Sequence, residues 1–555
     1  MKIKFCGAAE SVTGSCHLIS GEGFKILLDC GQFQGSKAQE AMNYSDFPFN
    51  PADIDFVVLS HAHIDHCGRI PLLVKRGFRG KIYCTDATAD LVQVMLRDSG
   101  YIHEKEAEWK NRKAERAGRP FVEPLYTVSD AEYSLRYLAP VMYDQLVEAN
   151  GKVKLVFNDA GHILGSAICE IWAEEGGKVT KLVFTGDIGA ADRPILRNPK
   201  QIKKADYVIM ESTYGDRAHG PNAAAITRLK DIVLNTARRG GTVVIPSFAV
   251  GRTQELIFEF NRLYESGTAV RHELDNIIFY VDSPMATAAT DIFRRNAQVF
   301  DEETKNYILE GDNPLDFRNL RFTRTSEESR ALNSDGRPKV IISASGMCDA
   351  GRIRHHLKHH LWNKNSSIVF VGYQARGTLG RALLDGIESV SLFGEEIQVN
   401  AEIHNLEGFS GHADRDGLLD WVSGLRQAPA QIFLVHGEQQ AKEALAASIR
   451  LAFGYEAHVV TEMSEFDMDK GEVMTRAELM ESFAGREQLE SMRRKLADVH
   501  GRLERILYNT HLAFSDGLPP ERVLQISDAV AALERDTINL GSAVTSENMA
   551  TAGQP

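Results

Sequence analysis

The sequence predicts an α/β protein in which one domain is interrupted by an inserted parallel α/β domain and is completed further along the chain. The length of 555 residues corresponds to about three folding units at roughly 100–200 residues per domain. Short β-branched runs separated by turns fill the first part of the chain, and units of a strand followed by a helix succeed them. Short strands then return, which predicts an insertion followed by completion of the first domain.

The first region, up to about residue 210, contains runs of β-branched and apolar residues bounded by Gly, Asp and Asn. Such runs are typical of strands. The predicted strands are Lys25–Leu28, Phe56–Leu59, Lys152–Phe157 and Lys181–Thr185. The intervening segment Leu91–Asn150 is charged and rich in Ala, Glu and Arg, which favours helices laid outside a sheet.

The second region repeats a strand, a loop and a helix four times, which predicts a parallel sheet covered by helices. The pairs are Thr242–Ile245 with Arg252–Leu263, Ile277–Val281 with Met285–Arg294, Val340–Ser343 with Gly351–Leu361, and Ser367–Val371 with Gly377–Leu384. Short strands around Glu396–Ile403 and Gln431–Val435 resemble the first region again. The predicted boundaries are therefore 1–212 and 395–465 for the interrupted domain, 213–394 for the insertion, and 466–555 for a C-terminal extension.

The C-terminal extension carries two stripes of mainly apolar residues spaced alternately three and four apart, Leu489–Ile506 and Val523–Leu540, with a turn at Ser515–Pro520. This spacing predicts two amphipathic helices in a hairpin. Each stripe is too short to indicate a coiled coil by itself. The pattern leaves two roles open, packing on the body of the protein or forming a homodimer.

The composition is that of an ordinary globular protein. The chain has 63 Lys and Arg against 76 Asp and Glu, a formal net charge of −13, and 43% hydrophobic residues, as ordinary globular proteins do. No apolar run approaches the roughly 18 residues that a membrane span needs, so no membrane association is expected. The N-terminal residues do not resemble a secretory signal. Seven cysteines without a CxxC pair predict reduced thiols in the cytoplasm.

Four potential metal ligands fall within six residues directly after the predicted strand Phe56–Leu59. They are His61, His63, Asp65 and His66. At a strand end, the spacing of two residues directs the first two side chains the same way. Imidazole and carboxylate groups are suitable ligands for zinc and similar divalent ions. Because these four groups cannot close two metal shells, further ligands are expected at other strand ends.

Those further ligands are present at three later strand ends. His162 lies between Gly161 and Gly165, Asp187 comes just past the strand that ends near Thr185, and His436 comes just past a later strand. Each residue alone has an ordinary structural explanation. Together with the HxHxDH segment, the set predicts a metal site.

This pattern resembles the metallo-β-lactamase fold, whose signature is HxHxDH followed by a distant His, Asp and His. The resemblance implies an αββα sandwich that binds two metals between its two sheets. The implied ligands of the first metal are His61, His63 and His162. Those of the second are Asp65, His66 and His436. Asp187 would bridge the two metals.

Three further residues resemble motifs A, B and C of the β-CASP nucleases, a family that includes the cleavage and polyadenylation endonuclease and ribonuclease J. These are Glu211 at a strand end, His412 in the segment FSGHAD, and His436. The resemblance covers about residues 1–460 and includes the segments IPSFAVGRTQE and SASGMCDAGR. It implies that the insertion is a β-CASP domain. A histidine at motif C accompanies RNA substrates in this family, whereas the members that act on DNA generally carry valine.

The resemblance therefore implies a metal-dependent ribonuclease that acts on single-stranded RNA in RNA processing or decay. Two Zn²⁺ ions are expected, with Mn²⁺ as the alternative. A hydroxide between the metals would attack phosphorus and leave 5′-phosphate and 3′-hydroxyl ends. His412, kept cationic by Glu211, would protonate the leaving oxygen. The predicted catalytic residues are Asp65, Asp187, Glu211 and His412. We expect internal cleavage, with 5′ exonuclease activity as an addition or an alternative.

Candidate RNA contacts lie in loops of the insertion that follow strands, because backbone N–H groups near helix starts suit phosphate. Two arginines beside these loops strengthen the prediction, even though the whole chain is acidic. The predicted residues are Arg252, Ser343, Ser345, Gly346, Arg376, Gly377 and Thr378.

Three other functions fit part of the pattern. A small-molecule metallohydrolase of the same fold would explain the seven ligands but not the insertion, Glu211 or His412. A noncatalytic RNA-processing scaffold would not need every ligand to be present. A DNA nuclease would fit everything except His436 at motif C.

Overall fold

The computed structural model describes residues 1–218, 222–374, 377–406 and 408–478. The chain divides into two compact units, Met1–Arg476 and Ala477–Pro555. The predicted helical hairpin in the C-terminal extension lies outside the described residues, so the two roles left open for it, packing on the body or forming a homodimer, stay predictions. None of the described helices is long and apolar enough to cross a membrane.

The interrupted domain contains two sheets that face each other. The first has the strand order β23 (Glu472–Met474), β22 (Glu465–Asp467), β1 (Lys2–Gly7), β2 (Cys16–Gly21), β3 (Phe24–Leu28), β4 (Phe56–Val58), β5 (Lys81–Thr85) and β6 (Leu138–Val141). The second has the order β21 (Ala457–Val459), β20 (Gln431–Val435), β11 (Tyr207–Glu211), β10 (Lys178–Phe184), β9 (Ala167–Glu175), β8 (Val153–Asp159) and β7 (Val147–Asn150). Phe5 of the first sheet and Phe157 and Phe433 of the second belong to one buried cluster that joins them.

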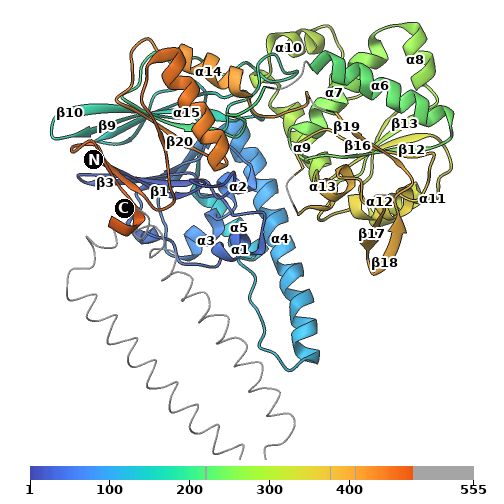
Figure 1. Ribbon diagram of the computed structural model, residues 1–555, viewed down its shortest axis with the longest axis horizontal. Helices are drawn as coiled ribbons and strands as arrows, with labels where there is room; N and C mark the ends of the chain where they lie inside the picture. The colour runs from blue at the N-terminus through green and yellow to red at the C-terminus, as the bar shows by residue number, and fades with distance from the viewer. Residues whose placement is uncertain (219–221, 375–376, 407, 479–555) are drawn as a thin grey trace, which may run out of the picture. The chain divides into compact units, whose positions relative to one another are not determined.

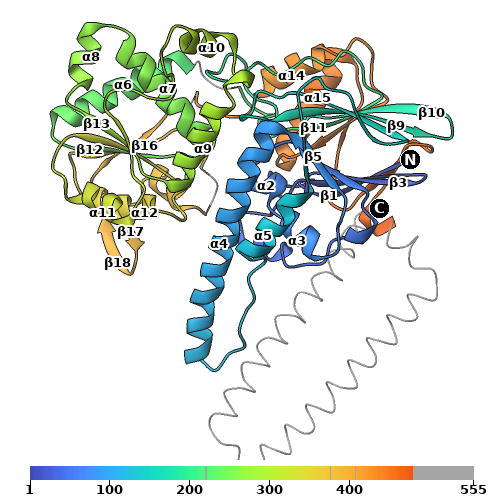
Figure 2. The same ribbon diagram turned by 180° about the vertical axis from the view of Figure 1, so that it is seen from behind.

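Helices cover the outer face of each sheet (Figures 1 and 2). Those beside the first sheet are α1 (Lys37–Met42), α2 (Ile64–Cys67), α3 (Ile70–Lys75), α4 (Asp86–Arg116) and α5 (Val128–Ser134). Those beside the second are α14 (Arg415–Ser423) and α15 (Gln439–Phe453). Thr85 caps the start of α4, where its side chain accepts a hydrogen bond from the backbone N–H of Thr88. Short 3₁₀ turns lie at Pro51–Asp53, Leu135–Tyr137 and Ala297–Val299.

The insertion is built on a six-stranded sheet in which every neighbouring pair is parallel. Its order is β14 (Leu320–Phe322), β13 (Ile278–Val281), β15 (Lys339–Ser343), β12 (Thr242–Pro246), β16 (Ser367–Phe370) and β19 (Glu402–Asn405). Its helices are α6 (Asn222–Arg238), α7 (Arg252–Glu265), α8 (Thr268–Leu274), α9 (Pro284–Arg295), α10 (Glu302–Leu309), α11 (Ser326–Ser334), α12 (Ile353–His360) and α13 (Leu379–Leu384). A hairpin of β17 (Ser389–Leu392) and β18 (Glu395–Gln398) extends from it. The predicted sandwich with a parallel α/β insertion is confirmed within the described residues.

Three details differ from the sequence-based expectations. Strand β19 pairs in parallel with β16, so the sheet of the insertion continues past residue 394. Strand β22 pairs with β1, so the first sheet continues past residue 465. The segment predicted to be helical up to Asn150 contains β6 and β7. In each case the strand is three or four residues long, too short for its sequence to reveal its partner.

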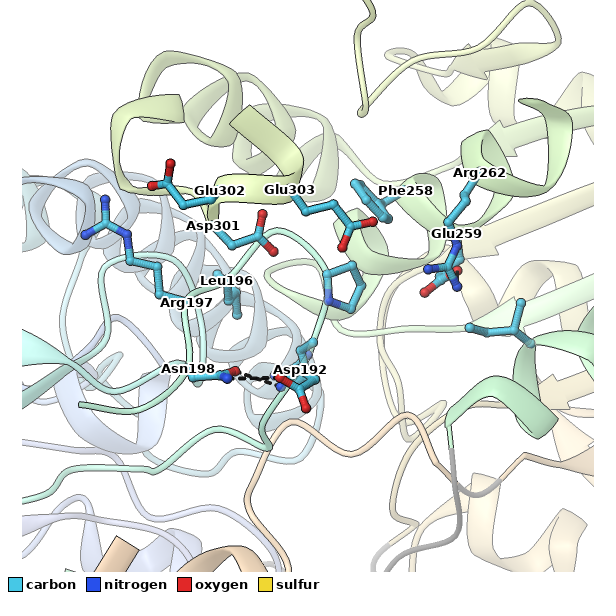
Figure 3. Close-up of a pocket in the computed structure, with 13 residues that line it drawn as sticks. Asp192, Leu196, Arg197, Asn198, Phe258, Glu259, Arg262, Asp301, Glu302 and Glu303 are labelled. Atoms are coloured by element: carbon cyan, nitrogen blue, oxygen red, sulfur yellow. Dashed lines mark hydrogen bonds and ion pairs between the residues drawn. The ribbon is translucent and has the colours of Figure 1, made fainter. Parts of the chain in front are cut away.

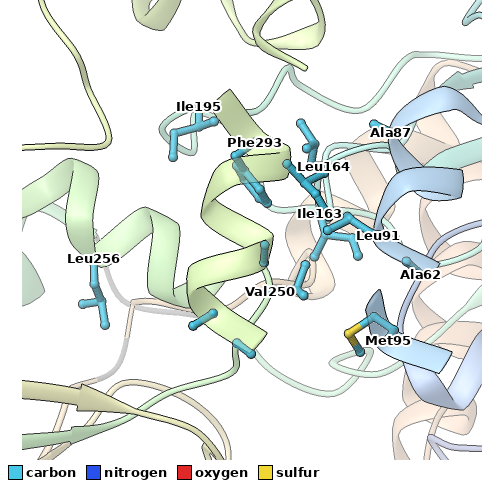
Figure 4. Packing of buried hydrophobic residues seen from close by; sticks show 14 of the residues in the cluster. Ala62, Ala87, Leu91, Met95, Ile163, Leu164, Ile195, Val250, Leu256 and Phe293 are labelled. Atoms are coloured by element: carbon cyan, nitrogen blue, oxygen red, sulfur yellow. The ribbon is translucent and has the colours of Figure 1, made fainter. Parts of the chain in front are cut away.

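One apolar core crosses from the interrupted domain into the insertion (Figure 4). Leu91 and Met95 of α4 and Ile163 belong to the same buried cluster as Val250 and Phe293 of the insertion. Helices α4 and α9 are in contact. This core holds the insertion against α4 and the loop that follows β8.

Candidate metal centre

The structure brings all seven predicted metal ligands together. They project from loops that follow strands of both sheets or from the short helix α2. They form two groups, His61, His63, His162 and Asp187 in one and Asp65, His66 and His436 in the other. The sandwich therefore assembles the site from residues that are far apart in the sequence.

The first group has the spacing of a tetrahedral metal site. His63 Nδ1 lies 3.1 Å from both His61 Nε2 and His162 Nε2. Asp187 Oδ2 lies 3.5 Å from His61 Nε2 and 3.6 Å from His162 Nε2. Donors that share a tetrahedral zinc ion lie about 3.3 Å apart. Burial holds the pKa of His61 and of His162 well below the ordinary value, which favours the neutral form that binds metal.

The second group lies on the other side of Asp187. His66 Nε2 is 3.2 Å from His436 Nε2, and Asp65 Oδ2 is 3.5 Å from His436 Nε2. Asp187 Oδ1 is 3.4 Å from His66 Nε2. Asp187 is 2% exposed, and its Oδ1 atom has no hydrogen-bond partner among the described residues. Because a buried carboxylate oxygen without a partner is unfavourable, this atom suits a cation shared by the two groups.

Asp29 is a candidate site residue that the sequence analysis missed. It is fully buried at the end of β3, where its Oδ2 accepts hydrogen bonds from His66 Nδ1 at 2.6 Å and Ser60 Oγ at 2.9 Å. Its Oδ1 accepts from the backbone N–H of Ser60 at 2.8 Å. The bond to Nδ1 leaves Nε2 of His66 directed into the site, as in carboxylate–histidine–metal arrangements. The available signal was a carboxylate just past a strand, the same signal that identified Asp187.

Asp29→Asn is expected to weaken metal binding by about 10–100-fold. The amide group of the variant would face either His66 Nδ1 or the N–H of Ser60, so one hydrogen bond to Asp29 must be lost. Competition with a chromophoric chelator measures the affinity. Asp282→Asn is the matched control, because Asp282 is also a fully buried carboxylate bonded to a histidine, His356, but lies in the insertion. Equal metal affinity in Asp29→Asn and the unaltered protein would contradict the role of Asp29.

Three of the other predicted ligand histidines also have one ring nitrogen engaged by a neighbouring polar group. His162 Nδ1 donates to the carbonyl of Gly411 at 3.0 Å. His436 Nδ1 lies 3.1 Å from Thr213 Oγ1, and His61 Nδ1 lies 3.0 Å from Ser60 Oγ. These bonds fix each ring and leave one nitrogen for a metal.

Glu211 and His412 form a pair beside the first group. His412 Nδ1 lies 3.2 Å from each carboxylate oxygen of Glu211, which is 1% exposed at the end of β11. The His412 ring centroid lies 4.4 Å from that of His162. Burial disfavours the charged imidazole, but the carboxylates of Glu211 and Asp187 outweigh this effect and raise the pKa of His412 to about 9. The pair therefore holds a proton next to the predicted metal ligands.

The loops predicted to contact RNA lie after strands of the inserted sheet. Ser343 ends β15, and its hydroxyl donates to the carbonyl of Asp282 at 2.8 Å. Ser345 and Gly346 follow, and the Gly346 carbonyl accepts from Gln374 Nε2 at 3.0 Å. Gly377 and Thr378 precede α13. Arg376 lies outside the described residues. RNA binding by these loops stays a prediction.

Arg252 differs in its surroundings from what the sequence analysis expected. Its guanidinium is buried, with Nη1 2.5 Å from Glu255 Oε2, and it lies over the ring of Phe409 at 5.7 Å. The two charged residues are three positions apart on α7 and pair on the face that points into the protein. This position joins Arg252 to the domain interface, and direct contact with RNA stays a prediction.

A cavity of about 530 Å³ lies between the loop that contains Arg193 and Arg197 and the helices α7 and α10 (Figure 3). Its lining includes acidic side chains, among them Glu259 and Glu303, and the basic Arg262. None of the predicted metal ligands lines it. The sequence did not indicate this cavity, because its walls come from four separate segments.

Comparison with families of known proteins gives three matches along the chain. Residues 11–133 match the metallo-beta-lactamase superfamily. Residues 253–383 match the Beta-Casp domain. Residues 396–460 match the Zn-dependent metallo-hydrolase RNA specificity domain. The last match includes His412 and His436.

Several curated proteins are similar over most of the chain. Ribonuclease TTHA0252 of Thermus thermophilus is 38% identical over 451 residues, which cover 81% of this chain and 96% of that protein. The transcription termination factor FttA of Methanocaldococcus jannaschii is 33% identical over 472 residues, which cover 83% of this chain and 70% of the relative. FttA of Methanococcus maripaludis is 32% identical, with 79% of this chain and 67% of the relative covered.

Proposed function

The chain belongs to the β-CASP ribonuclease family of the metallo-β-lactamase fold, and on this premise we propose that it hydrolyses phosphodiester bonds in single-stranded RNA. The observation that carries the proposal is the Glu211–His412 pair beside the seven grouped ligands. A hydrolase of this fold needs the ligands to activate water. The additional proton-bearing pair suits a reaction whose leaving oxygen must be protonated.

The donor set supports two divalent metal ions. His61, His63 and His162 would hold one ion and Asp65, His66 and His436 the other, with the two oxygens of Asp187 directed at both. Bound divalent ions supply the Lewis acidity that activates water and neutralises charge on the phosphate. Nitrogen and oxygen donors in tetrahedral spacing support zinc, and manganese is the alternative.

The side chains of this protein then protonate the leaving group. Glu211 holds Nδ1 of His412, so Nε2 is the atom that donates a proton to the departing 3′-oxygen. His412 is 21% exposed, so solvent can return the proton after each cleavage. The products are a 5′-phosphate on one fragment and a 3′-hydroxyl on the other. Because no 2′-hydroxyl takes part, a deoxynucleotide at the cleaved position is expected to leave the chemistry intact.

Two observations support RNA over DNA and over small substrates. The RNA specificity domain match covers His412 and His436, and a relative that is 38% identical is named a ribonuclease. We propose internal cleavage, in RNA processing or decay, as the main activity. Trimming from the 5′ end is the alternative mode.

The test uses a structured RNA labelled at either end, purified protein, and added zinc or manganese. Internal fragments with 5′-phosphate and 3′-hydroxyl ends are expected, and a deoxynucleotide at the cleaved position should change the rate by less than about tenfold. Release of mononucleotides alone from a 5′-monophosphorylated RNA would show the exonuclease mode. Cleavage of DNA but not RNA, or no cleavage by protein that retains two metals, would contradict the proposal.

A further inference from the structure

Arg193 joins the candidate metal centre to the insertion. It lies in the loop between β10 and β11 and is buried. Its Nη1 atom donates to the carbonyl of His162 at 2.9 Å and to the carbonyl of Gly411 at 3.1 Å. Its Nη2 atom donates to Glu255 Oε2 of α7 at 2.8 Å. One guanidinium therefore holds the backbone of a predicted metal ligand, the residue before the predicted acid, and a helix of the insertion.

The bonds on the metal side share one acceptor. The carbonyl of Gly411 accepts from Arg193 and also from His162 Nδ1, at 3.0 Å. The next residue but one, Ala413, donates its N–H to the carbonyl of Ile188 at 2.7 Å. A shift of the Gly411 carbonyl would therefore turn the His162 ring and move the backbone of His412 at the same time.

On the insertion side, Arg193 bonds to Glu255, which is buried and held by further contacts. Glu255 lies in the first turn of α7, is 3% exposed, and also accepts from Arg252. The neighbouring Gln254 donates to Thr290 Oγ1 of α9 at 2.9 Å. Because one buried carboxylate balances two buried guanidinium groups, removing its charge would leave both cations unpaired.

A second arginine of the same loop crosses to the insertion without touching the metal centre. Arg197 donates from Nε to the carbonyl of Phe300 at 3.2 Å and from Nη2 to the carbonyl of Gln298 at 3.0 Å. The apolar core in Figure 4 also joins the two domains. Attachment of the insertion therefore does not by itself require Arg193, and the distinguishing feature of Arg193 is its bonds to His162 and Gly411.

We propose that Arg193 and Glu255 are positioning residues. Their ion pair links the position of the insertion on the first domain to the geometry of His162 and His412. This link between the insertion and the metal centre rests on the proposed function only where it predicts an effect on RNA cleavage. Its effect on metal binding and on backbone protection does not depend on which substrate the protein cuts. An insertion displaced by substrate entry or by a partner would loosen the metal site and the acid together.

The test compares Arg193→Lys and Glu255→Gln with the control Arg197→Lys. A lysine at 193 keeps the charge, but one ammonium group cannot reach two carbonyls and a carboxylate. For both test variants we expect kcat to fall by on the order of 10–100-fold while KM for RNA changes by less than about threefold. Metal affinity, measured by chelator competition, should fall, and amide hydrogen exchange at Gly411–Ala413 should accelerate. Arg197→Lys should match the unaltered protein in all four measurements.

Two results would overturn the proposal. One is an equal loss in Arg193→Lys and Arg197→Lys, which would show that any weakening of the interface has the same effect. The other is unchanged exchange at Gly411–Ala413 in a folded Arg193→Lys protein. If Glu255→Gln does not fold, Arg193→Lys alone decides. If the unaltered protein does not cleave RNA, the proposed function fails, while metal affinity and exchange still decide the coupling.

Discussion

Asp187→Ala is expected to leave the purified protein without its full complement of metal and to reduce RNA cleavage at least about a thousandfold, because metal-ion chemistry contributes several kcal/mol to such reactions. Asp187 is the one ligand whose two oxygens face both groups, with Oδ2 near His61 and Oδ1 near His66. Its removal would therefore take a donor from both predicted metals at once. Elemental analysis of the purified variant and the end-labelled RNA assay measure the two effects.

Asp206→Ala is the matched control for that variant. Asp206 is a carboxylate just before β11 in the same sheet, where it accepts a hydrogen bond from the backbone of Lys181 at 2.7 Å. It is not among the grouped ligands, so its variant should keep both metals and cleave RNA normally. Two tightly bound metals per chain in Asp187→Ala would show that this residue is not the shared ligand.

His412→Ala is expected to lower kcat by about 10²–10⁴-fold, the usual contribution of a general acid, with RNA affinity and metal content preserved. The physical reason is that Nδ1 of His412 is committed to Glu211, so the ring carries a proton and does not complete either ligand group. Single-turnover cleavage, RNA binding without turnover, and elemental analysis separate the three quantities. Loss of a metal in this variant would make His412 a ligand, because Asp187, Glu211 and His412 are also close enough to form a donor group.

The pH dependence of cleavage provides an independent check on His412. A carboxylate beside the imidazole raises the pKa of His412, so the protonated acid persists to higher pH, and the rate falls as the pH rises through that pKa. Glu211→Gln keeps the shape of the side chain but removes its charge. The alkaline limb of the kcat profile should then move to lower pH. An unmoved limb would assign the proton to another group.

The sequence predicted which seven side chains group together, because the most informative part of the pattern is local. Four of the predicted ligands fall within six residues, and their spacing alone indicates a shared metal site. They are His61, His63, Asp65 and His66. His162, Asp187 and His436 could be added because the ends of neighbouring strands meet at one edge of a sheet. The same physical rule applied to Asp29, which was missed because an aspartate before a Cys-Gly turn also has an ordinary structural use.

The contacts across the domain interface could not be predicted in the same way. Arg193 and Glu255 are 62 positions apart and meet only because α7 packs against the loop after β10. Arg252 was predicted to contact phosphate because it lies beside a loop that follows a strand, whereas the carboxylate three residues later pairs with it inside the protein. The partners of short strands could not be predicted from the sequence either. Strand β19 has four residues, and only its neighbour β16 determines which sheet it joins.

The parallel pairing of β11 with β20 (Tyr207 opposite Gln431) has a consequence for synthesis of the protein. The insertion separates these neighbours, so a growing chain displays the HxHxDH segment long before His412 and His436 emerge from the ribosome. A nascent chain that ends before residue 412 therefore lacks the predicted proton donor and leaves the second donor group without His436. The predicted site can therefore be completed only after the whole inserted domain has been synthesised.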